Sequence, residues 1–168
     1  MKMLVIVLFL LFCSNHLFAQ SNKYHVSLNI NYSKMDLFTG CSLMSIKKKF
    51  DHEFSLYTGT IRTFFQSSFF PMIQYSFNYK LLNKLTYSFS PLISMNIAML
   101  NLKTTKANIH LYPEILIGYK LTYGKKIGII HKSSIGLLSE CFQTQFNETK
   151  WASTFSYHFN IGIYYAIN

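Results

Sequence analysis

The final segment of the chain alternates strictly between large apolar and small polar side chains. From Trp151 to Ile167, the odd-numbered positions hold mainly aromatic and branched aliphatic residues. The even-numbered positions hold mainly Ala, Thr, Ser, His, Asn and Gly. A period of two residues places these sets on opposite faces of a β-strand. The segment is therefore predicted to be one long strand with an apolar face and a polar face.

The same period recurs along the rest of the chain. It is clear over 24–32, 72–81, 85–99 and 108–123, and weaker over 41–49, 53–64 and 126–138, which makes eight predicted strands with the last one. Short connections (KKFDHE, LLNK, GKK) alternate with longer ones (KMDLFTG, FFQSSFF, NLKTTKA, SECFQTQFNETK). An even number of strands with this alternation predicts an all-β, antiparallel up-and-down barrel that occupies residues 20–168 as one domain.

Side-chain chemistry favours a barrel whose apolar face points outward. Only 13% of the residues are charged, whereas about a quarter are charged in soluble domains. The small polar groups suit a narrow lumen. The tyrosines near strand ends suit aromatic girdles at two membrane interfaces; they are Tyr24, Tyr32, Tyr79, Tyr119, Tyr123 and Tyr165. The sequence thus predicts a transmembrane barrel. A soluble, lipocalin-like periplasmic binding barrel stays open as an alternative, because the period alone does not decide which face is inside.

The N-terminus has the layout of a secretory signal peptide. Lys2 precedes an apolar run from Met3 to Phe12, and Ala19 is a small residue suited to cleavage before Gln20. Ten apolar residues are too few to span a bilayer as a helix, which needs about 20. We therefore expect residues 1–19 to be removed on export. The ending FAQ is similar to signal peptides of Bacteroidetes.

Together, these features resemble the small outer-membrane β-barrel proteins of Gram-negative bacteria. The resemblance implies location in the outer membrane, with both termini and the short turns in the periplasm and the long loops outside. It implies contact with membrane lipid and lipopolysaccharide, and recognition of the last strand by the barrel assembly machinery. That strand usually ends in an aromatic residue in the family, whereas this chain ends in Asn168.

The expected function is a structural or surface-interaction role without a pore, because side chains fill a barrel of this size. The apolar loop FFQSSFF (64–70) is a candidate contact for lipopolysaccharide or for an extracellular or envelope protein. The net charge of +10 comes from scattered lysines and one arginine, so nucleic-acid binding is not expected. Lysines at the predicted periplasmic rim either snorkel on solvated turns or contact anionic groups; they are Lys47, Lys48, Lys49, Lys84, Lys125 and Lys126.

Two interactions are predicted between residues far apart in the sequence. Cys41 and Cys141 fall near the first and last outer loops, which flank the same seam of a closed barrel, so they are candidates for a disulfide. The two-residue alternation places Glu114 on the lumen face, where a carboxylate needs a cation as its partner. Lys132 is the main candidate, with Lys120 and Lys80 as others. His25, His110 and His158 are predicted to fill the lumen as hydrogen-bonding groups, and no metal or cofactor site is expected.

One pair of residues raises an enzymatic alternative. His131 and Ser133 are two positions apart on one face of the predicted seventh strand, as a base beside a nucleophile would be. The pattern is similar to the lipid A 3-O-deacylase family, and the resemblance implies that Glu140 or Glu148 would complete the site. The family's Asn after the Ser is Ser134 here. Ile127, Ile129, Ile135 and Leu137 indicate that this face points to lipid, although a two-residue turn at Gly124 would reverse it.

Overall fold

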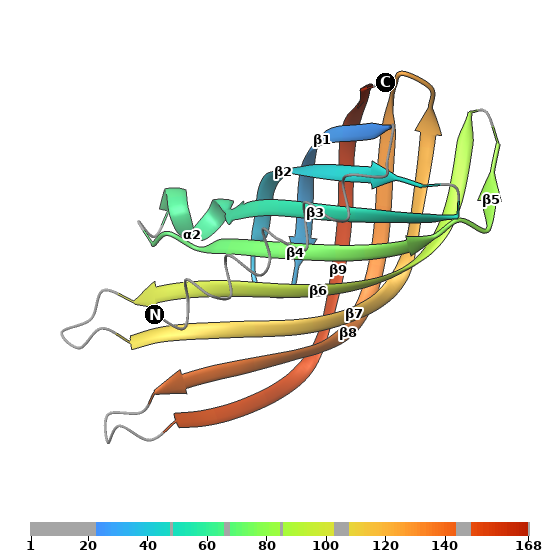
Figure 1. Cartoon of the computed structure of the whole chain (residues 1–168). Coiled ribbons are helices and arrows are strands. Elements are labelled where there is room, and N and C mark those ends of the chain that lie inside the picture. Colours follow the sequence, from blue (N-terminus) through green and yellow to red (C-terminus); the bar gives the residue numbers. More distant parts are fainter. Residues whose placement is uncertain are drawn as a thin grey trace, which may run out of the picture.

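Eight long strands, each antiparallel to its neighbours, close into a barrel (Figure 1). The computed structural model describes residues 23–47, 49–65, 68–84, 86–102, 108–143 and 149–167, so the predicted signal peptide (1–19) lies outside the described residues. The barrel strands are β1 (Tyr24–Ser33), β2 (Leu37–Ile46), β3 (Phe50–Gly59), β4 (Pro71–Tyr79), β6 (Tyr87–Leu102), β7 (Asn108–Gly124), β8 (Ile127–Gln143) and β9 (Thr149–Ile167). One helix, α2 (Thr60–Phe65), and a short strand, β5 (Leu82–Asn83), complete the described elements.

The strand order confirms the predicted up-and-down topology. Neighbours run β4-β3-β2-β1-β9-β8-β7-β6, and pairing of β4 with β6 closes the barrel. The short β5 pairs only with the start of β6, where Leu82 lies opposite Phe89. In the described part of the chain, no helix combines the length and the hydropathy that a membrane-crossing helix requires.

Two predicted strands begin and end earlier than expected. The stretch KMDLFTG is not a long loop, because the Ser33 N–H donates to the Asp36 carbonyl at 3.0 Å and a tight turn joins β1 to β2. Likewise β3 starts at Phe50 and ends at Gly59, where α2 begins. The first outer connection is therefore short, and the second contains a helix.

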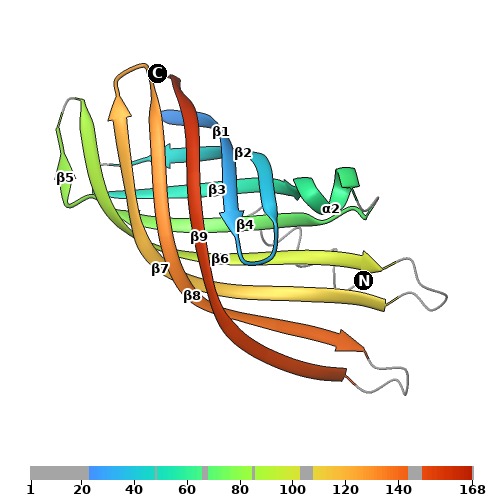
Figure 2. The same cartoon turned by 180° about the vertical axis from the view of Figure 1, so that it is seen from behind.

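The barrel has two different ends. Tyr24 lies opposite Ile167, so the first and last strands share one end, which we call the terminal end. The connections after β2, β4 and β7 also lie there. The opposite end, which we call the loop end, holds the β1–β2 turn, α2, and the distal parts of β6 to β9. These four strands are longer than β1 to β4 and extend well beyond the β1–β2 turn (Figure 2).

Polar residues line the lumen and apolar residues cover the outside. On β1, Leu28 and Ile30 are exposed, whereas Ser27, Asn29 and Asn31 are buried. The exposed aromatic residues include Tyr79, Tyr123 and Tyr165 at the terminal end and Tyr32 at the loop end, as expected for two girdles. This polarity is that of a transmembrane barrel. It does not favour the lipocalin-like alternative, in which the apolar face would line the cavity.

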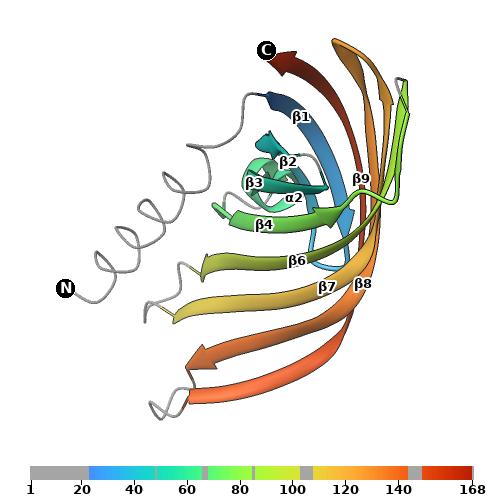
Figure 3. The same ribbon diagram turned by 45° about the vertical axis from the view of Figure 1, so that its right-hand side comes forward.

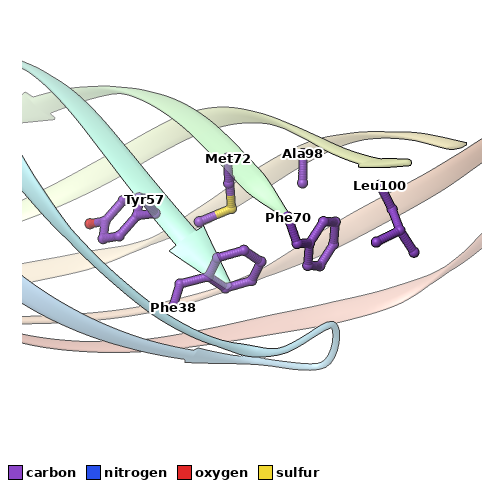
Figure 4. Packing of buried hydrophobic residues seen from close by; sticks show 6 residues of the cluster. All are labelled: Phe38, Tyr57, Phe70, Met72, Ala98 and Leu100. Atoms are coloured by element: carbon purple, nitrogen blue, oxygen red, sulfur yellow. The ribbon is translucent and has the colours of Figure 1, made fainter. Parts of the chain in front are cut away.

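An apolar cluster plugs the lumen near the loop end (Figure 4). Its members are Phe38, Tyr57, Phe70, Met72, Ala98 and Leu100. Asp36 holds α2 over this cluster: its carboxylate accepts the Ile61 and Arg62 N–H groups at 3.2 and 3.1 Å, as well as the Leu37 N–H. The stretch FFQSSFF is thus not a simple exposed loop, since Phe70 is fully buried while Phe69 is exposed.

Candidate functional site

The lumen half nearer the terminal end contains a buried network of charges. Asp51 and Glu53 point inward from β3, two positions apart. The Lys80 ammonium lies 2.9 Å from Asp51 Oδ1, and the Lys120 ammonium lies 3.5 Å from Asp51 Oδ2. Lys132 donates to the Glu53 carboxylate from across the lumen. Because buried charges are strongly disfavoured unless paired, these contacts explain how three lysines are tolerated inside the barrel.

Glu114 lies in the lumen as predicted, but its partner is a histidine. Its Oε2 accepts the Asn96 amide at 2.8 Å and lies 2.7 Å from His158 Nε2. The other ring nitrogen of His158 lies 2.9 Å from the Asn31 amide nitrogen. The predicted Glu114–Lys132 pair is therefore wrong: the register of the closed barrel brings Lys132 to Glu53 and leaves Lys120 and Lys80 with Asp51.

Asp51 and Glu53, the two acidic residues that pair with these lysines, are not among the lumen residues predicted from the sequence. The predicted strand bounds put both of them in or beside a short turn, KKFDHE. The signal is nevertheless present, because Asp51, Glu53 and Ser55 alternate with the outward-facing Phe54 and Leu56. A third strand that starts at Phe50 places both carboxylates in the lumen.

Side chains leave little free space inside the barrel. A cavity of about 10 Å³ is lined by Asn31, Gln74, Leu92, Lys132, Ser134, His158 and Asn160. That volume is about what one water molecule needs. The Asn160 amide donates to the Tyr57 hydroxyl at 2.9 Å, which connects the polar network to the apolar cluster beneath α2. The described lumen is therefore filled by side chains from the charge network up to this cluster.

The structure places His131 and Ser133 on the outer face of β8, on the face shared with Ile129 and Ile135. The orientation inferred from the flanking isoleucines is thus correct. His131 packs against two aromatic neighbours: its Nε2 lies 3.2 Å from the Tyr119 hydroxyl and its ring lies 4.8 Å from that of Phe159. No hydrogen bond joins His131 to Ser133 among the described contacts. The arrangement is that of an aromatic outer surface.

Glu140 does not complete a site with these two residues. It follows His131 by nine positions on β8, which is roughly 30 Å along an extended strand. Because nine is an odd number, its side chain also lies on the opposite face of β8. Its Oε1 instead lies 2.9 Å from His110 Nδ1 and accepts the Tyr112 hydroxyl at 3.0 Å. Glu148, the other candidate, lies outside the described residues. The described geometry therefore does not assemble the predicted hydrolase site.

Cys41 and Cys141 are both free thiols, so the predicted disulfide is wrong. Cys41 lies within β2, opposite Leu28, and Cys141 lies within β8, opposite Trp151. Strands β1 and β9 separate them. Three strand spacings amount to roughly 14 Å, whereas bridged cysteines have Cα atoms within about 7 Å. The described residues also contain no group of three or more His, Cys, Asp or Glu placed to hold a metal ion.

No protein-family model and no curated protein matches the sequence. Solved structures do match the fold. The N-terminal β-barrel domain of OprF from Pseudomonas aeruginosa aligns with a TM-score of 0.57 and 10% identity over 88% of this chain and 98% of that domain. A major outer membrane protein from Thermus thermophilus aligns with a TM-score of 0.51 and 7% identity over 86% of this chain and 99% of that one. The chain thus has the fold of the outer-membrane β-barrels.

Proposed function

We propose that this chain is an outer-membrane barrel with a structural or surface-interaction role, and that its lumen is not a conducting pore. The observation that supports this most directly is the filled lumen. Charged pairs occupy the half nearer the terminal end, and an apolar cluster under α2 occupies the half nearer the loop end. An ion crossing the barrel would have to displace both.

The outer surface supports placement in a bilayer. The ten residues of β1 match the roughly 9–11 that a tilted strand needs to cross the hydrocarbon. At the terminal end, the Lys84 ammonium lies 5.3 Å from the Tyr87 ring and the Lys126 ammonium lies 5.7 Å from the Tyr165 ring. Such pairs suit a polar–apolar interface. We place the terminal end in the periplasm and the loop end outside the cell, after removal of the signal peptide.

The proposed contacts follow from this placement. The apolar belt contacts membrane lipid, and the loop end contacts lipopolysaccharide and an extracellular or envelope protein. The alternating last strand, β9, is the segment that the barrel assembly machinery would recognise. The hydrolase role is not favoured, because His131 packs among aromatic rings and Glu140 has other partners.

Two measurements test the proposal. On a gel of detergent-extracted membranes, unboiled protein should run faster than boiled protein, as a closed barrel does, whereas recovery in the soluble periplasmic fraction would contradict the membrane placement. In planar lipid bilayers, the purified protein should give no discrete current steps, with an established porin as the positive control. Reproducible steps from the folded protein would overturn the non-pore role while leaving the membrane placement intact.

A further inference from the structure

One strand of the barrel has an edge that no described strand covers. Pairing between β1 and β9 runs from Tyr24–Ile167 to Ser33–His158 and stops there, because β1 turns into β2. Pairing between β8 and β9 continues to Gln143–Thr149. Over Thr149–Tyr157, β9 therefore has β8 on one side and no strand of the described chain on the other (Figure 3). We call this segment the β9 edge.

The phase of the hydrogen bonds determines which groups the β9 edge presents. The Ala166 N–H donates to the Lys126 carbonyl at 2.8 Å, and the β8–β9 register is continuous from there to Thr149. In an antiparallel ladder, alternate residues bond to the same neighbour. Even-numbered residues of β9 thus bond to β8, and odd-numbered ones, such as Ser153 and Phe155, direct their N–H and C=O groups to the open side.

Lys34 provides independent support for this phase. Its ammonium donates to the Phe155 carbonyl at 3.3 Å and to Thr154 Oγ1 at 2.7 Å. The carbonyl of an odd-numbered residue therefore does point away from β8. Lysines commonly protect exposed strand edges, and this contact covers only one of the groups along the β9 edge.

The β9 edge lies beyond the hydrocarbon if the barrel is placed as proposed above. The whole of β1 is needed to cross the apolar layer, and the edge begins where β1 ends. Unpaired backbone groups would be very costly in hydrocarbon. On the aqueous side of the loop end, the same groups are available to a partner.

The side chains along the β9 edge indicate what kind of strand would fit. Trp151, Phe155 and Tyr157 lie on one face and are exposed, at 66%, 57% and 39%. Ala152, Thr154 and Ser156 lie on the other face, and the ammonium of Lys34 stands beside them. A complementary strand would have apolar residues on the first face and a carboxylate near Lys34.

We propose that the β9 edge binds an extended segment of a partner protein outside the cell, which adds to the sheet as a further strand. Backbone hydrogen bonds to the odd-numbered residues would supply affinity. The aromatic row and Lys34 would select a segment that alternates apolar and polar side chains and includes an acidic one. This inference rests on the proposed membrane placement and identifies the class of partner for the surface-interaction role.

Selection of peptides against the folded protein tests the inference. Nine-residue peptides displayed on phage would be selected against the protein in lipid nanodiscs, with empty nanodiscs as the background. Enriched peptides should show the alternating apolar pattern with an acidic residue. Their affinity should then be compared between the wild-type protein, Ser153→Pro and Ser153→Ala.

The two variants at Ser153 test whether the peptides bind at the β9 edge or elsewhere on the surface. Both lose the contact between the Ser153 and Ser139 hydroxyls. Proline removes only an N–H that faces the open side, so β8–β9 pairing should persist. Ser153→Pro should weaken peptide binding by roughly tenfold or more, through the lost hydrogen bond and the steric block. Ser153→Ala should bind as the wild type does.

Three results would overturn the inference. They are no enrichment over empty nanodiscs, equal binding by the Pro and Ala variants, and a dimer of this chain that Ser153→Pro abolishes. The last would assign the edge to a second copy instead. A heat-modifiability gel of each sample establishes beforehand that the barrel is folded, so failure of the membrane placement is recognised separately.

Discussion

Lys120 on β7 and Lys132 on β8 lie directly opposite each other in the ladder, although both are cations buried in the lumen. Like charges in opposite positions normally destabilise a sheet. Here each ammonium reaches a different carboxylate of β3: Lys120 meets Asp51 and Lys132 meets Glu53. The spacing of Asp51 and Glu53 on one face of β3 therefore matches the two cations on the far wall.

Removal of Lys132 from its pair with Glu53 should destabilise the barrel strongly. Lys132→Met leaves the Glu53 carboxylate buried without its closest cation, which should lower the free energy of unfolding by about 3–5 kcal/mol. Urea unfolding in detergent, followed by the fluorescence of Trp151, measures this. The double variant Lys132→Met/Glu53→Leu should lose less than the single one, and equal losses would contradict the pairing.

The β7–β8 turn should depend on a glycine. Gly124 has a φ of +127°, and a Cβ there would lie 2.4 Å from the Ile127 carbonyl oxygen. Gly124→Ala should therefore cost about 1–3 kcal/mol of stability. Lys125→Ala, at the next position, is the matched control and should stay within about 0.5 kcal/mol of the wild type in the same unfolding experiment.

The position of α2 should depend on Asp36. Asp36→Ala removes the acceptor of the Ile61 and Arg62 N–H groups, so backbone amide hydrogen exchange across Thr60–Phe65 should become faster. Loss of such a cap costs about 0.5–2 kcal/mol. Asp36→Asn keeps one acceptor oxygen and should give an intermediate rate. Equal protection in all three proteins would show that packing alone positions the helix.

Cys41 and Cys141 should both react as free thiols when no reductant is present. The denatured protein should give the same thiol count before and after reduction, because Cys41 and Cys141 lie on strands separated by β1 and β9. A colorimetric thiol assay in denaturant measures the count. A gain of two thiols on reduction would mean that the cysteines are bridged.

Substitution of His131 or Ser133 should not alter lipid acylation. His131→Phe preserves a ring between Tyr119 and Phe159, and Ser133→Ala removes only the hydroxyl. Mass spectrometry of lipid A from cells producing each folded variant should match the wild type and a strain that lacks the protein. If lipid A lost acyl chains in cells with the wild-type protein but not in cells with either variant, the hydrolase alternative would be supported instead.

The sequence by itself determined the strands and their faces. The period of two residues separates Leu28 and Ile30 from Asn29 and Asn31, and the small size of the polar groups indicates that they face a narrow lumen. These are properties of a single strand, set by the backbone pleat, so they can be inferred locally. The number of strands and the outward apolar face were predictable for this reason, and the antiparallel order followed from the alternation of short and long connections. The bounds of β2 and β3 were not, since both strands begin and end earlier than the pattern indicates.

Only the tertiary structure decided which residues meet across the lumen and at the barrel ends. Glu114 contacts His158, and Lys132 contacts Glu53. The relative shift of all the strands in the closed barrel determines which side chains lie at the same level of the lumen and can therefore meet. The length of β1 relative to β9 likewise decides that the β9 edge is open. No local pattern encodes these relationships, since each depends on strands that are distant in the sequence and meet only when the barrel closes.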